Sequence, residues 1–168
     1  QPGSVTPIFS ATMGTVDDVG EQLWRSAIRA GAGSQTTLHG VGDGASWITN
    51  QLDLRFGTQA VYLVDFYHLC EYVALAGEVV AGEGKEAWIE EKKNWLKDNR
   101  WADVLTNLQP YLEGENVLDK DAPVRACYRY ISNRPNFLDY KSALAAGLPI
   151  GSGEIESAHR YVIQIRLK

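Results

Sequence analysis

The apolar run Ala60–Val64 constrains the fold of this chain more than any other stretch, because five successive apolar residues leave no face for water. Such a run is typical of a strand buried on both faces of a parallel sheet. A β-prone run also covers residues 35–41, and helical spacing covers residues 46–56 between the two runs. A right-handed strand-helix-strand unit would place the two strands side by side. The sequence therefore predicts an α/β fold.

A further helix is predicted ahead of this unit. Thr15 and Asp18 have the spacing of a capping box, in which a hydroxyl and a carboxylate satisfy the first backbone amides of a helix. Apolar residues then recur at helical spacing as far as Gly31, a natural stop. In the helix at 46–56 we expect Trp47 to point inward.

The composition changes after residue 73. Residues 74–146 contain three tryptophans and many charged side chains, and they show no convincing strand. Trp88 and Trp95 are seven residues apart, which indicates amphipathic helices that pack through tryptophan. The charged residues, Lys92 among them, are expected to form a solvated face. We predict three parts: residues 1–73 as the first part of a core, 74–146 as an all-helical insertion, and 147–168 as the last, catalytic helix of the core.

Carboxylates follow both predicted strands. Asp43 lies between Gly42 and Gly44, and Asp65 follows the apolar run directly. Ligands of open α/β sheets bind at the carboxyl ends of strands, so both aspartates lie where a site is expected. The glycines would let a metal or phosphate approach closely, although a plain turn aspartate is the simpler alternative for Asp43. His68 lies three residues after Asp65, a spacing that suits a hydrogen-bonded carboxylate–imidazole pair or a pair of metal ligands. A structural histidine is the alternative.

Polar residues are also concentrated where a helix is predicted to begin near the C-terminus. The segment Gly151-Ser152-Gly153 leads into a helical pattern in which Glu156 and Arg160 share a face. Glu154 lies on the opposite side and suits the positive end of the helix dipole. We assign chemistry to Glu156, while an ordinary N-cap at Ser152 with solvated glutamates is the alternative.

Charge and cysteine content restrict the partners. A net charge of -5 offers no general attraction to nucleic acid, so a basic binding surface would have to be local. Two cysteines in 168 residues indicate no disulfide framework and suit a reducing cytosol. No apolar run approaches the roughly 20 residues of a membrane span. We expect a soluble, cytoplasmic protein with no membrane partner.

Three ordered motifs resemble those of bacterial insertion-sequence transposases. They are VGDGASWI at 41–48, VDFYH at 64–68 and the stretch from GSGEIES to RLK at 151–168. The closest likeness is to the ISKra group, related to the Mutator-like superfamily of DDE enzymes, and it covers nearly the whole chain. The resemblance implies a ribonuclease H-like core with a helical insertion before the last catalytic helix.

The resemblance also implies a two-metal site for DNA cleavage and strand transfer. In this family three acidic residues hold two Mg²⁺ or Mn²⁺ ions, which activate a water or a 3′-hydroxyl and stabilise the leaving oxygen of a phosphodiester. By motif position Asp43 resembles the second acid and Glu156 the third, whereas Asp65 and His68 resemble the supporting D-x-x-H signature. The candidates for phosphate or DNA contact are Arg160, Arg166 and Lys168.

The sequence departs from the family pattern at one point. No acidic residue before Asp43 matches the first catalytic aspartate, so we expect that aspartate, its strand and a separate DNA-binding region to lie upstream of Gln1. This piece alone is then expected to be inactive. For the full-length protein we expect transposon ends and target DNA as partners, a homo-oligomer, and a place on the nucleoid.

Three questions stay open at this point. The position of both aspartates at strand ends does not decide whether Asp43 or Asp65 is the second metal ligand. A non-catalytic, transposase-derived binding or assembly module would explain the missing first aspartate. A mononuclear zinc metallohydrolase would use Asp65, His68 and His159, although these histidines lack a compact metal-ligand spacing.

Overall fold

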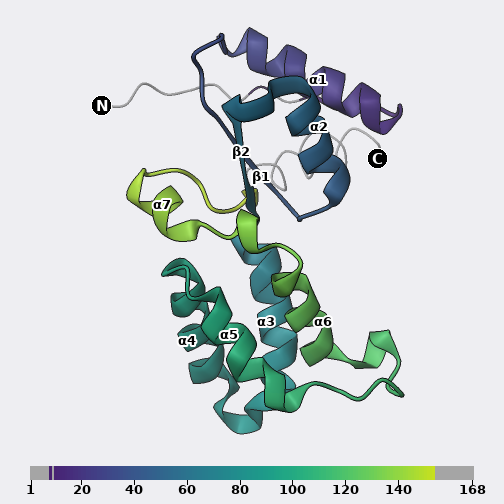
Figure 1. Cartoon of the computed structure of the whole chain (residues 1–168), viewed down its shortest axis with the longest axis vertical. Coiled ribbons are helices and arrows are strands. Elements are labelled where there is room, and N and C mark those ends of the chain that lie inside the picture. Colours follow the sequence, from purple (N-terminus) through teal and green to yellow (C-terminus); the bar gives the residue numbers. More distant parts are fainter. Residues whose placement is uncertain (1–7, 9, 154–168) are drawn as a thin grey trace, which may run out of the picture. The chain divides into compact units, whose positions relative to one another are not determined.

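The computed structural model describes Ile8 and residues 10–153, and these form a mixed α/β structure that is mostly helical (Figure 1). Contacts divide the chain into two compact units. The first contains the described residues up to Gly40 together with Ala45–Tyr62, and the second contains Val41–Gly44 and Leu63–Ser152. The helices and strands are α1 (Val16–Arg29), β1 (Leu38–Gly42), α2 (Ser46–Phe56), β2 (Ala60–Val64), α3 (Phe66–Val80), α4 (Lys85–Lys97), α5 (Trp101–Leu108), α6 (Pro123–Ser132) and α7 (Tyr140–Ala145).

The predicted capping box at the start of α1 is confirmed. The Asp18 amide donates to the Thr15 hydroxyl over 3.3 Å, and the Thr15 amide donates to the Asp18 carboxylate over 2.7 Å. The helix packs on α2 through polar side chains, among them a 2.9 Å hydrogen bond from Gln51 Nε2 to Asp17 Oδ1. Gly20 makes this approach possible, because a Cβ there would overlap the Gln51 amide.

The prediction that Trp47 points inward is wrong, since 41% of the residue is exposed. The buried side of α2 is centred on Gln51 and Leu52, which are 6% exposed each. At about 100° per residue, Trp47 lies roughly 90° from the middle of that face. The polar contact with α1, rather than the aromatic residue, therefore sets the orientation of α2.

Both predicted strands form, and they pair as a two-stranded parallel sheet. Tyr62, Leu63 and Val64 at the end of β2 are buried, whereas Val61 is 54% exposed. The prediction of burial on both faces therefore holds for the second half of the strand. The pairing continues one residue beyond β2, where the Asp65 amide donates to the Gly42 carbonyl over 2.6 Å.

The second unit is built around α3, whose buried side meets α4 and α6 (Figure 1). Leu69, Val73 and Ala76 lie on this side and are completely buried. Residues 74–146, all of which the structure describes, form helices and no strand. The role of this segment as an insertion in a ribonuclease H-like core stays a prediction.

Lys92 contradicts the expected solvated face of the helical segment, because it is 1% exposed. Its ammonium lies 3.6 Å from the centroid of the Trp95 ring and 5.2 Å from that of Trp88. It also donates a 2.5 Å hydrogen bond to Glu91. Two tryptophan faces and one carboxylate therefore compensate the desolvated charge.

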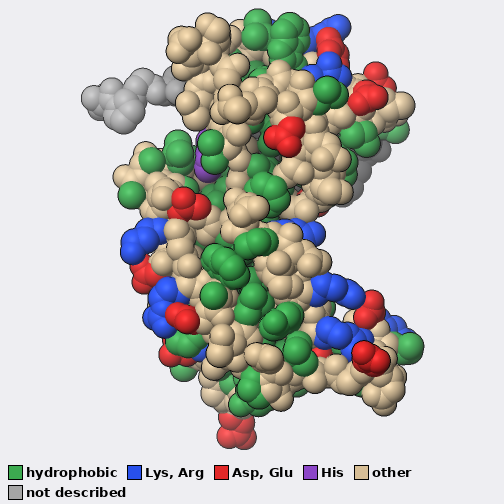
Figure 2. All heavy atoms as spheres, in the orientation of Figure 1, with side chains coloured by type: hydrophobic (Ala, Val, Ile, Leu, Met, Phe, Trp, Pro, Cys, Tyr) green, Lys and Arg blue, Asp and Glu red, His purple; other side chains and the backbone are tan. Residues whose placement is uncertain are grey.

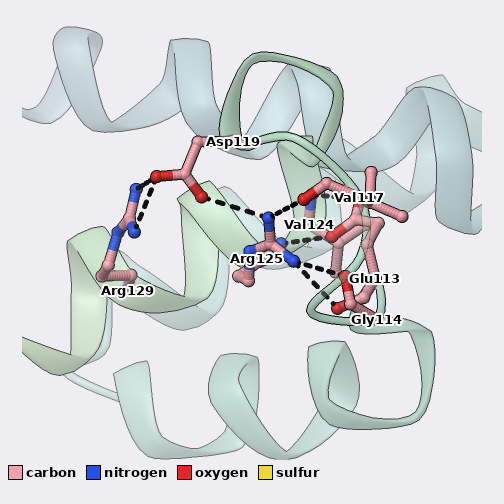
Figure 3. A network of polar contacts seen from close by, with 7 residues as sticks. All are labelled: Glu113, Gly114, Val117, Asp119, Val124, Arg125 and Arg129. Carbon is pink, nitrogen blue, oxygen red and sulfur yellow. Dashed lines mark hydrogen bonds and ion pairs between the residues drawn. The ribbon is translucent and has the colours of Figure 1, made fainter.

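A single arginine holds the long connection between α5 and α6 in shape (Figure 3). The Arg125 guanidinium donates to the backbone carbonyls of Glu113, Gly114 and Val117 and to the carboxylate of Asp119. The Glu113 carboxylate in turn accepts the amides of Val124 and Arg125 over 2.9 and 2.7 Å, at the start of α6. Glu113, which lies in the connection before α6, thus caps the first turn of that helix.

Candidate functional site

The two parallel strands end at one edge, and an aspartate follows each of them. The hydrogen bond between the Asp65 amide and the Gly42 carbonyl fixes the two strand ends beside one another. Asp43, the next residue after β1, is exposed. Asp65, the next residue after β2, is 6% exposed. The expectation that both aspartates reach the same edge of the sheet is confirmed, but their surroundings differ.

Two side chains of the α6 region hold the turn that carries Asp43. The Tyr130 hydroxyl donates to the Asp43 carbonyl over 2.6 Å, and Arg134 Nε donates to the Gly44 carbonyl over 3.0 Å. Gly44 has a φ of 82°, and a Cβ there would overlap the Arg134 side chain. Glycine is therefore required at this position for two reasons, the backbone conformation and the close approach of Arg134.

The Asp65 carboxylate accepts four hydrogen bonds. Oδ1 accepts the backbone amides of Tyr67 and His68 over 2.8 and 3.3 Å, which makes Asp65 the N-cap of α3. Oδ2 accepts the Ser152 amide over 2.8 Å and also the Ser152 hydroxyl. Burial raises the pKa of Asp65, but the hydrogen bonds from Ser152, His68 and Tyr67 outweigh it and hold the pKa below its usual value. These donors take up the roughly four lone-pair positions of the carboxylate.

The segment around Gly151 lies directly against the start of α3. The Phe66 amide donates to the Ile150 carbonyl over 2.8 Å. A Cβ on Gly151 would overlap the Tyr67 ring, so this close contact requires glycine. The fully buried Tyr140 reaches the same region, where its hydroxyl donates to the Val64 carbonyl over 3.0 Å.

The imidazole of His68 is directed to a partner other than Asp65. Its Nδ1 lies 3.1 Å from a carboxylate oxygen of Glu71, and its ring meets Tyr72 and Tyr130 edge-on. Tyr72 and Tyr130 stack with their ring centroids 4.3 Å apart. His68 thus belongs to an aromatic cluster, and its link to Asp65 runs through the backbone amide.

The other predicted site residues, which are Glu156, Arg160, Arg166 and Lys168, lie outside the described residues, as do Glu154 and His159. Among Ile8 and residues 10–153, no group of three or more histidine, cysteine or acidic side chains is arranged to hold a metal ion. A hard cation such as Mg²⁺ binds carboxylate oxygen, and the exposed Asp43 fits that requirement. Asp65 fits it poorly, because a metal would have to displace backbone and hydroxyl donors.

Two residues of this region carried no signal in the sequence. Tyr130 and Arg134 bind the turn at Asp43 across 87 and 90 positions of the chain. Neither residue belongs to a motif. Helical spacing predicts which residues share a face of a helix, but it does not predict which side chain will hydrogen-bond to a turn elsewhere in the chain. The pairing of Ser152 with Asp65 is similarly remote, although both residues lie in motifs that the sequence singled out.

The surface of the helical unit mixes charges of both signs. Figure 2 shows acidic and basic side chains beside one another over α3 to α7, on the face that it presents. Several of them form ion pairs, such as Arg100 with Asp103 over 2.6 Å and Lys85 with Glu78 over 2.6 Å. Within the described part of the chain, no helix has the length and apolar character needed to cross a membrane.

Comparison with protein-family models, with curated proteins and with solved structures gives no match for this chain. The structure itself defines a mixed α/β protein. It has a two-stranded parallel sheet, an aspartate after each strand and a helical unit built on α3.

Proposed function

We propose that this chain is the catalytic region of an insertion-sequence DDE transposase of the ISKra group, with a ribonuclease H-like core. One observation carries the proposal: the three motifs of the resemblance meet at one place. Gly42 of the first motif accepts the Asp65 amide, and Asp65 of the second accepts both donors of Ser152 in the third. Segments more than 80 residues apart in the sequence are thus joined at the carboxyl edge of a parallel sheet, where α/β proteins bind ligands.

In this proposal Asp43 and Glu156 hold the metal ions, and Asp65 does not. Asp43 is exposed at the strand end, on a turn fixed by Tyr130 and Arg134. The oxygens of Asp65 are already engaged by four donors. Glu156 follows Ser152 by four residues in the sequence.

Two bound Mg²⁺ or Mn²⁺ ions would activate the attacking oxygen and stabilise the leaving oxygen of a phosphodiester. The chain would bind the DNA backbone through basic side chains, with Arg160, Arg166 and Lys168 as candidates. Transposon ends and target DNA are the proposed substrates, and a homo-oligomer on the nucleoid is the proposed assembly. The ion pairs of the helical unit suggest that its mixed surface is not the main DNA contact.

Manganese binding to the full 168-residue chain tests this function, because the free ion gives an electron paramagnetic resonance signal that disappears on binding. We expect weak binding that falls at least tenfold in Asp43→Asn and in Glu156→Gln. Asp121→Asn changes an exposed carboxylate of the same helical unit and serves as the matched control, with unchanged affinity. An unaltered chain that leaves the Mn²⁺ signal intact at millimolar ion would contradict the proposal and favour a non-catalytic remnant.

A further inference from the structure

We propose that Arg134 binds a phosphate group of the DNA backbone beside Asp43, so that the helical segment contributes a substrate contact of its own. The inference rests on the proposed function for the identity of the substrate. Arg134, the turn at Asp43 and every residue that holds the guanidinium belong to the second unit. The motifs of the sequence do not include Arg134.

Two backbone carbonyls hold the Arg134 side chain in one orientation. Nε donates to the Gly44 carbonyl over 3.0 Å, and Nη1 donates to the Tyr130 carbonyl over 3.1 Å. The guanidinium carbon lies 4.1 Å from the centroid of the Tyr130 ring, where the ring face attracts a cation. The Arg134 amide is also bound, to the Ile131 carbonyl over 3.0 Å. A ligand would therefore meet a guanidinium that is already ordered, which lowers the entropy cost of binding.

The charge of Arg134 is not neutralised in the way that the charges of its neighbours are. Both of its acceptors are uncharged carbonyls, and within the described part of the chain no carboxylate lies at ion-pair distance from it. The other arginines of the helical unit each form an ion pair with an aspartate: Arg100 with Asp103, Arg125 with Asp119, and Arg129 with Asp119. The uncompensated charge makes Arg134 the arginine of this unit best suited to an anionic ligand.

The free donors of Arg134 match a phosphate group. A guanidinium has five N–H groups, and the two bonds to carbonyls leave three of them for a ligand. The groups on Nη1 and Nη2 form a planar fork that fits two oxygens of one phosphate. The side chain is half-buried, so water screens such a bond less than it would at an exposed arginine.

The position of Arg134 links this anion site to the proposed reaction. Gly44, whose carbonyl accepts from Arg134, directly follows Asp43 on the turn after β1. Enzymes that transfer phosphoryl groups commonly place an arginine where charge develops on the phosphate oxygens. A bare Asp43 carboxylate repels phosphate, so we expect weak DNA binding when no metal ion is present.

Fluorescence anisotropy in EDTA and low salt tests the contact on the full 168-residue chain. The probe is a labelled single-stranded oligothymidylate of about ten nucleotides. We expect Arg134→Met to bind about tenfold more weakly, and the slope of log affinity against log salt to fall by about 0.7. Arg129→Met removes the same charge from an exposed, ion-paired arginine and should stay within about twofold of the unaltered chain. Equal affinities of the two variants would overturn the role of Arg134.

A second readout uses the unaltered chain and does not depend on the folding of a variant. The nuclear magnetic resonance signal of the Arg134 Nε–H group should shift when the oligothymidylate is added. Inorganic phosphate at the same phosphate concentration should shift it less, since a free ion lacks the other contacts of a DNA chain. No shift with the oligothymidylate, or a larger shift with inorganic phosphate, would overturn the DNA contact.

The two proposals fail in different ways. A chain that binds Mn²⁺ through Asp43 but shows neither DNA response of Arg134 would keep the proposed function and overturn the role of Arg134. A chain that shows both DNA responses but binds no Mn²⁺ would support the phosphate contact at Arg134 and overturn the proposed function.

Discussion

The hydroxyl of Tyr130 donates a 2.6 Å hydrogen bond to the backbone carbonyl of Asp43, across 87 positions of the sequence. The tyrosine is 6% exposed and is stacked on Tyr72, so its position is set by the helical unit rather than by the turn. The turn that presents the Asp43 carboxylate is therefore fixed from α6.

Tyr130→Phe should lower the free energy of unfolding by about 1 kcal/mol, because it removes this hydrogen bond and keeps the stacked ring. Urea unfolding followed by circular dichroism measures the change. Tyr128→Phe, on the same helix, is the control and should stay within about 0.5 kcal/mol of the unaltered chain. Equal stability of the two variants would show that the bond to Asp43 contributes nothing.

Gly151→Ala should destabilise the second unit by roughly 1–3 kcal/mol, since the added methyl group overlaps the Tyr67 ring and forces the chain away from α3. Gly84→Ala is the matched control, because no described atom lies within 4 Å of a Cβ at that position. Thermal unfolding of the two variants gives the comparison. If Gly151→Ala melts at the same temperature as Gly84→Ala, the close contact with Tyr67 is not present in solution.

Arg125→Met should loosen the connection between α5 and α6, because it deletes donors to three backbone carbonyls and to Asp119 (Figure 3). We expect a loss of about 2 kcal/mol in stability. Trypsin cleavage after Lys120, which lies in this connection, should become faster. Arg129→Met is the control: this 55% exposed side chain pairs with Asp119 at the surface, so we expect a loss of no more than about 1 kcal/mol. Unchanged cleavage after Lys120 in Arg125→Met would contradict the proposed role of Arg125.

Acid should weaken the fold partly through Asp65. The hydrogen bonds that Asp65 accepts hold its pKa in the folded chain below the ordinary value of 3.8. A group with a lowered folded pKa contributes stability that is fully present above its unfolded pKa, and this stability is lost as the pH falls through the folded pKa. Stability should therefore decrease as the pH falls below about 4.

The variant Asp65→Asn separates this contribution from those of other carboxylates. It should be less stable at neutral pH, and its stability should depend less on pH below about 4 than that of the unaltered chain. Unfolding by urea at a series of pH values measures both effects. If the stability of the two proteins changed with pH by the same amount, the hydrogen bonds to Asp65 would not favour its ionised form.

Local patterns in the sequence predicted most of the regular structure of the first unit. The capping box at Thr15 and Asp18 gave the start of α1, and helical spacing gave α2 from Ser46 to Phe56. The apolar run gave β2, and the strand-helix-strand argument gave the adjacency of the two strand ends. These features depend on residues that are close in sequence, or on the restricted handedness of chain connections.

The environment of each candidate residue could not be predicted in the same way. The sequence pattern placed Lys92 among charged residues at the surface, but the side chain is buried and contacts two tryptophan rings and Glu91. The position of Asp43 and Asp65 at strand ends did not distinguish between them. In the structure Ser152, from a distant segment, donates a hydrogen bond to Asp65. Such long-range hydrogen bonds depend on how helices pack, and helical spacing does not encode the partner of an individual side chain.

A crystal structure of the full chain with Mn²⁺, located by its anomalous scattering, tests the central claim most directly. We predict that oxygens of Asp43 and Glu156 bind the same ion at about 2.1 Å, with their carboxylates within about 6 Å of one another. Asp65 should still hold Ser152 and should not touch the ion. An ion bound by Asp65, His68 and His159, with Glu156 directed elsewhere, would contradict the account and favour a metallohydrolase.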